Sequence, residues 1–283
     1  MIRVFARKTK WTPTDDLAFY DEPPLFDLPD LPVAVSVTFT WDIKHGHRLL
    51  NSWRRRWFHR KTKHYPGIGG PAFNHPGGKF IPGRFVKRGV IITSRGCPKR
   101  CPWCYAWQRE GNVRELQIYP GYIVQDNNLL ACSRGHIEKV FAMLAQQPMP
   151  ASFPGGLDID FLNEWHVGLL RDLQKAHRLG TMFVAFDTEK SLDKLPMAKE
   201  LLGEFHIDRR RAYVLIGFEG DTLEQAESRL ERVYDAGNGF LPFAMLFDGK
   251  KDDPEWRALQ RKWCRPAAYR KNLTTNEHEW TQV

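Results

Sequence analysis

The stretch GVIITSRGCPKRCPWCYAWQREG, residues 89–111, places a strand, a glycine turn and three cysteines in direct succession. The run from Val90 to Thr93 is rich in β-branched residues, which predicts a strand. Cys97, Cys101 and Cys104 follow the turn and are separated by three and then two residues. That spacing lets three thiolates converge on one inorganic centre and leaves a fourth coordination position open. Thiolates select soft centres, either zinc or an iron–sulfur cluster.

A structural zinc site normally closes with a fourth Cys or His at close spacing. The residues after the last cysteine are Tyr105, Ala106, Trp107 and Gln108, so no such ligand follows. A zinc knuckle and a disulfide loop are the alternatives to a cluster. The strand-then-turn context, the missing fourth ligand and the aromatic Trp103 favour the cluster.

The CPKRCPWC string, including Trp103, resembles the cluster motif of the radical S-adenosylmethionine (radical SAM) superfamily. The resemblance implies a [4Fe-4S] cluster held by Cys97, Cys101 and Cys104, whose fourth iron chelates the methionine moiety of S-adenosyl-L-methionine. It implies reductive cleavage of that cofactor to methionine and a 5'-deoxyadenosyl radical, which abstracts hydrogen from a substrate that the sequence does not identify. A one-electron reductant such as flavodoxin or ferredoxin is the implied partner.

Length and composition are those of a globular protein with a sizeable core. The chain has 283 residues, and 42% of them are hydrophobic. No apolar run approaches the ~20 residues that span a bilayer, so no membrane partner is expected. The N-terminus, MIRVFARKTKW, has no apolar stretch of signal-peptide length. Five cysteines, three of them clustered, argue against a secreted disulfide framework. We therefore expect a reduced, cytoplasmic compartment.

The charge balance favours polyanionic partners, because the formal net charge is +9. Basic residues are densest in RRRWFHRKTKH, residues 54–64, where aromatic residues interleave with the bases. This pattern suits phosphate contacts and base stacking and makes nucleic acid a candidate partner. A solvated surface is the alternative interpretation of such a run.

Strand and helix signals alternate from Gly89 onward, which predicts an α/β fold with a parallel sheet covered by helices. The superfamily resemblance sharpens this to an open (β/α)6 partial TIM barrel. The predicted strands are 90–93, 122–125, 151–153, 182–186, 213–218 and 241–247. Predicted helices lie near 103–110, after a Ser133 cap, over 162–176 and 197–202, and after a Thr222–Gln225 capping box.

Three regions are expected: an N-terminal extension (1–88), a radical SAM core (89–247) and a helical C-terminal tail (248–283). The extension is predicted as an irregular arm (1–30), a strand (32–41), a helix that begins after Asp42, a short strand with a Gly-rich turn (65–73), and a linker (74–88). It resembles a cut-down remnant of the cobalamin-binding domain that precedes many radical SAM cores. The Asp-x-His-x-x-Gly string of that domain is absent, so cobalamin is not expected. The tail, with Trp256, Trp263, Arg265 and Tyr269, is predicted as a basic amphipathic helix.

Polar residues follow the predicted strands, and the carboxyl ends of strands carry the site in α/β barrels. Asp126, Asn127 and Asn128 end the second strand, where the resemblance implies a contact to the methionine amino group, although the usual Gly-Gly-Glu is not matched. The resemblance implies a ribose contact at Asp187 and Thr188, and an adenine site formed by Gly217, Phe218 and Trp103. Asp158 ends the third strand and is a further candidate. Helix capping is the alternative role for Asp158 and Asp187.

Cys132 and Cys264 remain. Small buried side chains are the simpler interpretation of both; Cys264 as a thiol donor near the substrate is the alternative. Two further functions compete with the main hypothesis: methyl or methylthio transfer to RNA within the same superfamily, and a non-catalytic, zinc-dependent nucleic-acid-binding protein. The missing fourth ligand and the six β/α units argue against the zinc protein.

Overall fold

The computed structural model of the protein describes residues 1–58, 64–234, 239–267 and 269. Residues 59–63 of the predicted basic stretch and residues 270–283 of the predicted tail lie outside the described residues. The chain divides into two compact units: residues 1–100 with 104–127, and residues 101–103 with 128–283. None of the described helices is long and apolar enough to cross a membrane.

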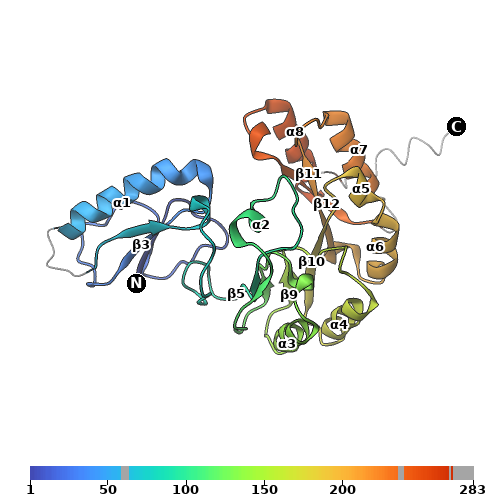
Figure 1. The fold of residues 1–283 in the computed structure, drawn as a ribbon, viewed down its shortest axis with the longest axis horizontal. Coiled ribbons are helices and arrows are strands. Elements are labelled where there is room, and N and C mark those ends of the chain that lie inside the picture. Colours follow the sequence, from blue (N-terminus) through green and yellow to red (C-terminus); the bar gives the residue numbers. More distant parts are fainter. Residues whose placement is uncertain (59–63, 235–238, 268, 270–283) are drawn as a thin grey trace. The chain divides into compact units, whose positions relative to one another are not determined.

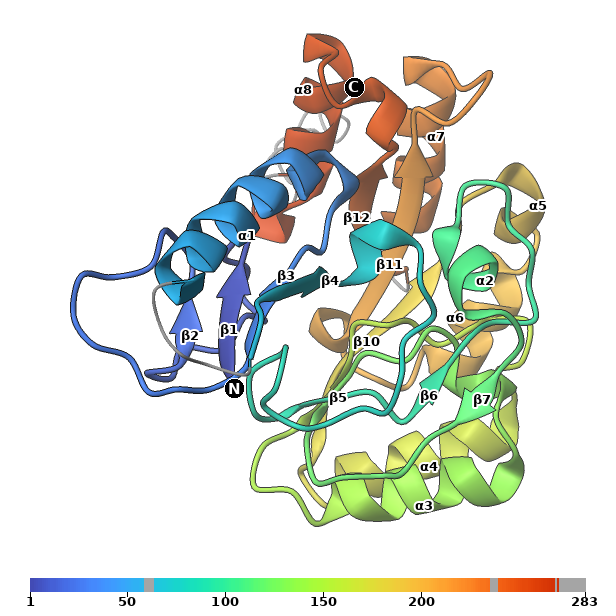
Figure 2. The same ribbon diagram turned by 60° about the vertical axis from the view of Figure 1, so that its left-hand side comes forward.

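The N-terminal part of the first unit is a four-stranded parallel sheet with one helix against it. Its strand order is β2-β1-β3-β4, and every pair is parallel. The elements are β1 (Ile2–Phe5), β2 (Ala18–Phe19), β3 (Val33–Ser36), α1 (Ile43–Phe58) and β4 (Gly67–Gly69). Helix α1 contacts β3 and β4 and lies along the sheet (Figure 2). The predicted strand, helix and short strand of the extension are therefore present.

Helix α1 forms because its apolar residues recur at helical spacing and meet the sheet. Leu49, Leu50, Trp53 and Trp57 are buried in one core with the side chains of β1 and β3. The helix follows a 3-10 turn, η1 (Thr40–Asp42). The Asp42 carboxylate accepts two hydrogen bonds of 2.7 Å from the Arg7 guanidinium rather than serving only the helix start.

The predicted irregular arm is wrong for residues 2–5. These residues form β1, which lies inside the sheet between β2 and β3, and all four are buried. Both faces of the strand are covered, so no alternation is visible, and Arg3 interrupts the apolar run. The buried Arg3 guanidinium pairs with Asp15 and donates to the carbonyl of Gly83 at 2.9 Å. Gly83 lies 80 residues further along the chain.

The rest of the first unit surrounds the cysteine motif. Strand β5 (Val90–Ile91) pairs in parallel with β8 (Ile123–Val124). Strand β6 (Ser94–Arg95) pairs antiparallel with β7 (Arg114–Glu115). Helix α2 (Tyr105–Glu110) lies between β6 and β7 in the chain. The antiparallel pair was not predicted, and it brackets the segment that carries the three cysteines.

The second unit contains a parallel sheet in the order β12-β11-β10-β9. Its strands are β9 (Ala151–Phe153), β10 (Leu179–Ala185), β11 (Arg210–Ile216) and β12 (Leu241–Leu246). Its helices are α3 (Arg134–Ala145), α4 (Glu164–Lys175), α5 (Glu189–Leu192), α6 (Leu195–Leu202), α7 (Leu223–Tyr234) and α8 (Pro254–Trp263). Short 3-10 turns are η3 (Leu129–Ala131), η4 (Ile207–Arg209) and η5 (Asp248–Lys250).

Helices pack against one face of this sheet (Figure 1). Along β11, Ala212, Val214 and Ile216 are buried, whereas Tyr213 and Leu215, on the opposite face, are only half-buried. Helix α7 contacts β11 and β12, and α8 contacts β12. The α/β class with parallel strands is therefore confirmed, and each of the six predicted strand positions contains a strand.

The predicted helix starts are partly right. Ser133 caps α3, and Thr222 and Gln225 form the expected reciprocal pair, with two backbone-to-side-chain hydrogen bonds of 3.2 Å. The helix predicted over 162–176 instead begins at Glu164 with Asn163 as its cap. It ends at Lys175, one residue before the predicted end.

Candidate functional site

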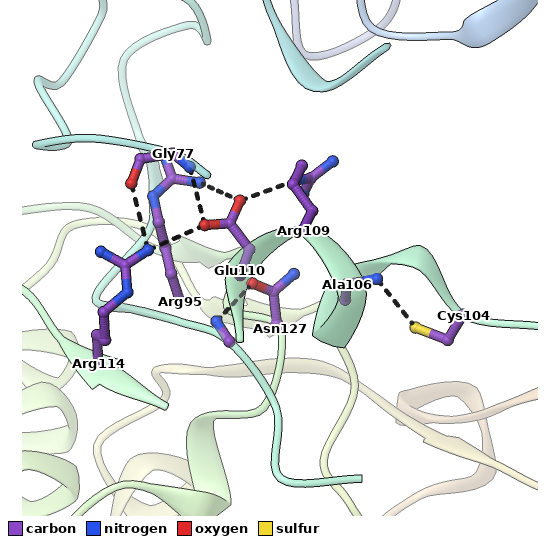
Figure 3. Close-up of polar contacts among 9 residues, drawn as sticks. Gly77, Arg95, Cys104, Ala106, Arg109, Glu110, Arg114 and Asn127 are labelled. Carbon is purple, nitrogen blue, oxygen red and sulfur yellow. Dashed lines mark hydrogen bonds and ion pairs between the residues drawn. The ribbon is translucent and has the colours of Figure 1, made fainter. Parts of the chain in front are cut away.

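The cysteine segment runs from β6 into α2. Cys97 donates its backbone N–H to the carbonyl of Gly111 at 3.1 Å, so both ends of the segment are tied together. Cys104 is the N-cap of α2, and its Sγ accepts the N–H of Ala106 at 3.4 Å (Figure 3). Cys97, Cys101 and Cys104 are all half-buried and free of disulfides.

The three cysteines have the ligand chemistry that an iron–sulfur cluster requires. Within the described residues, no three His, Cys, Asp or Glu side chains are arranged to hold a metal ion. Cys97 and Cys104 belong to the first unit, whereas Cys101 belongs to the second. The three thiols are nevertheless soft ligands in one short segment, and the backbone N–H on Cys104 Sγ suits a thiolate that carries negative charge. These three cysteines are the residues that would hold such a cluster.

Asn127 secures the start of the cysteine segment. Its side-chain oxygen accepts the backbone N–H of Gly96 at 3.0 Å (Figure 3). Gly96 has φ +89°, and a Cβ there would lie 2.1 Å from the carbonyl oxygen of Asn112. Only glycine fits this close approach in that conformation. Asn127, predicted to contact a cofactor, therefore positions the residue directly before Cys97.

Asp126 is buried, only 2% exposed, and its carboxylate is enclosed. One oxygen accepts the backbone N–H of Thr93 at 2.6 Å, and the other accepts the hydroxyls of Thr93 at 2.5 Å and Ser94 at 2.7 Å. Burial raises the pKa of Asp126, while the hydrogen bonds from Thr93 and Ser94 oppose that rise. The structure therefore uses Asp126 to join the end of β8 to the segment between β5 and β6, and does not present its carboxylate for the predicted methionine contact.

Asn128 and Asp158 are brought together in the second unit. The Asn128 amide donates to Asp158 Oδ2 at 2.7 Å, and Asp158 Oδ1 accepts the backbone N–H of Asp160 at 3.1 Å. Asp158 follows β9, as predicted. It does not cap the next helix, because Asn163 is the N-cap of α4. Asn128, which follows β8, and Asp158, which follows β9, are therefore two predicted site residues that are hydrogen-bonded to each other.

Asp187 and Thr188 have separate structural partners. Asp187 Oδ1 accepts the backbone N–H of Leu215 on β11 at 3.0 Å, so this carboxylate links the end of β10 to the neighbouring strand. Thr188 is the N-cap of α5 and forms a capping box with Ser191. The helix cap is therefore Thr188 and not Asp187, which corrects the alternative role considered for Asp187.

Trp103 and Phe218 meet in the second unit. Their ring centroids are 5.4 Å apart in an edge-to-face arrangement, and Phe218 contacts Phe247 in the same manner at 5.0 Å. Gly217 precedes Phe218 at the end of β11 with φ +76°. Trp103 and Phe218 are both half-buried. The aromatic residue of the cysteine motif thus lies beside the carboxyl ends of β11 and β12.

A buried ion pair holds the turn that carries Phe218. Arg229 of α7 donates to both carboxylate oxygens of Asp221, at 2.9 and 2.7 Å, and to the carbonyl of Leu215 at 3.0 Å. Asp221 also accepts the backbone N–H of Gly217 at 2.8 Å. The sequence did not predict the Asp221–Arg229 pair, nor did it predict Thr93 and Ser94 as the partners of Asp126. The one signal for the Asp221–Arg229 pair is an Asp at the start of a helix and an Arg eight residues later.

Cys132 and Cys264 are half-buried, and neither forms a disulfide bond within the described residues. Cys132 Sγ lies 4.0 Å from the carbonyl of Asn128, and Cys264 Sγ lies 3.6 Å from the carbonyl of Arg261. Each contact is with a carbonyl three or four residues earlier in the chain.

No protein-family model matches this sequence, and no curated protein matches it either. The interpretation of the site therefore depends on its own residues.

Proposed function

We propose that the protein is a radical SAM enzyme with a [4Fe-4S] cluster held by Cys97, Cys101 and Cys104. The observation that carries the proposal is the contact of Trp103, inside the three-cysteine motif, with Phe218 at the carboxyl end of a parallel strand. Active sites of α/β folds lie at this end of the strands. In this proposal the parallel strands belong to an open (β/α)6 partial barrel.

The cofactor supplies the difficult chemistry, and the protein supplies binding and orientation. When bound, the cluster would pass one electron to S-adenosyl-L-methionine, whose S–C5' bond breaks to give methionine and a 5'-deoxyadenosyl radical that takes hydrogen from the substrate. Flavodoxin or ferredoxin would supply the electron. The substrate itself is identified by none of the residues described.

The chain's own residues would divide the remaining tasks. Trp103 and Phe218 offer ring faces and edges on which an adenine can stack. The Asn128–Asp158 pair offers amide and carboxylate groups for the polar part of the cofactor. Asn127 and Asp126 act one step away, since they hold the segments that begin at Thr93 and Gly96.

The test is anaerobic reconstitution followed by reduction with dithionite in the presence of S-adenosyl-L-methionine. We expect a brown protein with about four iron atoms per chain and formation of 5'-deoxyadenosine and methionine. A variant with all three motif cysteines changed to Ala should lose both iron and products, whereas Cys132→Ala should keep both. S-Adenosylhomocysteine as the only product, or a colourless protein that retains zinc, would contradict the proposal.

A second candidate, RNA modification within the same superfamily, is favoured by the surface of α1. Lys44, Arg48, Arg54 and Arg55 are exposed on this helix, which contains no acidic residue. Phe58 at its end is 74% exposed. Exposed bases beside an exposed aromatic ring suit a single-stranded nucleic acid, whose phosphates pair with the bases and whose nucleobases stack.

A further inference from the structure

Three arginines of the first unit surround one carboxylate beside the cysteine segment (Figure 3). Arg109 Nε donates to Glu110 Oε1 at 2.8 Å, and Arg114 Nη2 donates to Glu110 Oε2 at 3.1 Å. Arg95 Nη1 lies 3.6 Å from Glu110 Oε1. The arginines come from β6, α2 and β7, so the chain brings them together from three elements.

The Glu110 carboxylate is already saturated by the protein. Its side chain is 1% exposed, and the backbone N–H of Gly77 donates to Oε2 at 2.9 Å in addition to the arginines. A carboxylate has about four acceptor positions. Glu110 carries a single negative charge, so it balances only one of the three positive charges around it.

Arg95 is the least satisfied member of the group. Its side chain is only 18% exposed, and its Nε–H is buried with no hydrogen-bond partner within the described residues. A buried guanidinium with unused donors is costly unless an acceptor meets it.

We propose that Arg95, Arg109 and Arg114 form an oxyanion-binding site for a phosphate group. Guanidinium groups form strong, charge-assisted hydrogen bonds to phosphate, and a phosphate has enough oxygens to meet donors from three directions. Glu110 orients the arginines and leaves the group an excess of positive charge. Arg114 is 45% exposed and gives the site its opening to solvent.

The site is independent of the proposed radical chemistry, since no residue in it is a cysteine ligand. A phosphate reaches it either as a small phosphate ester or as the phosphodiester of a nucleic acid. Both sources share the chemistry that the arginines recognise. Binding of free inorganic phosphate, adenosine monophosphate and a single-stranded oligoribonucleotide distinguishes a small phosphate ester from a phosphodiester.

The test is titration calorimetry of the full chain without iron, at about 50 mM salt, with each of the three phosphate compounds. Arg114→Gln removes one exposed charged donor, so we expect binding to weaken about tenfold or more. The control is Arg134→Gln, because Arg134 is an exposed arginine that also pairs with a glutamate, Glu138, four residues away. The affinity of Arg134→Gln for each phosphate compound should stay within twofold of that of the wild type.

Glu110→Gln is a second variant, and it should change the affinity for phosphate in the opposite direction to Arg114→Gln. Removal of the negative charge should make phosphate bind several-fold more tightly, and phosphate should raise the unfolding temperature of this variant more than that of the wild type. If Arg114→Gln weakens the binding of the small phosphates and of the oligonucleotide equally, the site recognises the phosphate group alone. Weakening with the oligonucleotide alone indicates a phosphodiester. No binding of any of the three, or equal binding by wild type and Arg114→Gln, would overturn the proposal.

Discussion

The Trp103 indole lies edge-to-face against the Phe218 ring, with 5.4 Å between the centroids and 69° between the planes. The two residues are far apart in the chain, yet both were predicted from the sequence to belong to one cofactor site. Phe218 in turn contacts Phe247, which follows β12. Within the second unit, the two contacts therefore place Trp103 beside the ends of two parallel strands.

Trp103→Ala should weaken binding of S-adenosyl-L-methionine to the cluster-loaded protein by about 1–3 kcal/mol, the range measured for loss of base–aromatic stacking. Iron content should be unchanged, because no thiol is altered. Equilibrium dialysis with labelled cofactor measures the effect. Trp165→Ala is the control, since Trp165 is a half-buried tryptophan of α4 that stacks with Arg134. Equal affinity in wild type and Trp103→Ala would exclude an adenine platform at this residue.

Asp221→Ala should lower the free energy of unfolding by about 3–5 kcal/mol, because it leaves Arg229 as an uncompensated buried charge. Both side chains are only 8% exposed. The matched control on the same helix is Arg232→Gln, which removes an exposed pair with Glu189 and should cost about 1 kcal/mol or less. Urea denaturation measures both. Similar losses in the two variants would show that the buried pair does not hold the Phe218 turn.

Asp126 should make stability depend on pH in a defined direction. Its pKa is raised in the folded protein by burial, so the folded state keeps a proton that the unfolded state has lost. This contribution is fully present below the unfolded pKa, about 4, and is lost as pH rises through the folded pKa. Asp126→Asn has no such titration. The free energy of unfolding of Asp126→Asn minus that of the wild type should therefore become more positive as the pH increases from 4.

Urea unfolding at several pH values measures this difference. Asp172→Asn, which changes an exposed carboxylate of α4, is the control for the loss of one negative charge, and the change with pH should be larger for Asp126→Asn than for this variant. A change with pH no larger for Asp126→Asn than for Asp172→Asn would show that Asp126 does not titrate differently in the folded state.

Neutralisation of the α1 surface should reduce the salt dependence of RNA binding. Lys44→Gln with Arg55→Gln removes two exposed charges, so the slope of log K against log salt should fall by about 1.4 for a single strand. Arg257→Gln with Arg261→Gln removes the same charge from the exposed face of α8 and serves as the control. Arg56 is left intact, because it donates to the carbonyls of Leu25 and Phe26. Fluorescence anisotropy gives both slopes, and equal slopes would assign α1 to an ordinary solvated surface.

Local patterns predicted most elements of this fold because their signals lie within a few residues. The β-branched run Val90–Thr93 marked the position of β5, and Ser133 and Thr222 marked helix starts. Strand β1 escaped prediction because a strand covered on both faces shows no alternation, and because Arg3 interrupts its apolar run. The antiparallel pair of β6 and β7 escaped because each strand is only two residues long.

The sequence by itself determined that three thiols stand in one short segment with an aromatic residue among them, since covalent spacing alone sets that arrangement. Only the tertiary structure decided what the polar residues nearby do. Asp126 lies 33 residues from its partner Thr93, and Asp187 lies 28 residues from Leu215. Hydrogen-bond partners at such separations depend on which strands are neighbours, and no local pattern encodes that. Arg109 and Arg114 are close to Glu110 in the sequence, whereas Arg95 lies near its carboxylate in a structure where β6 pairs with β7.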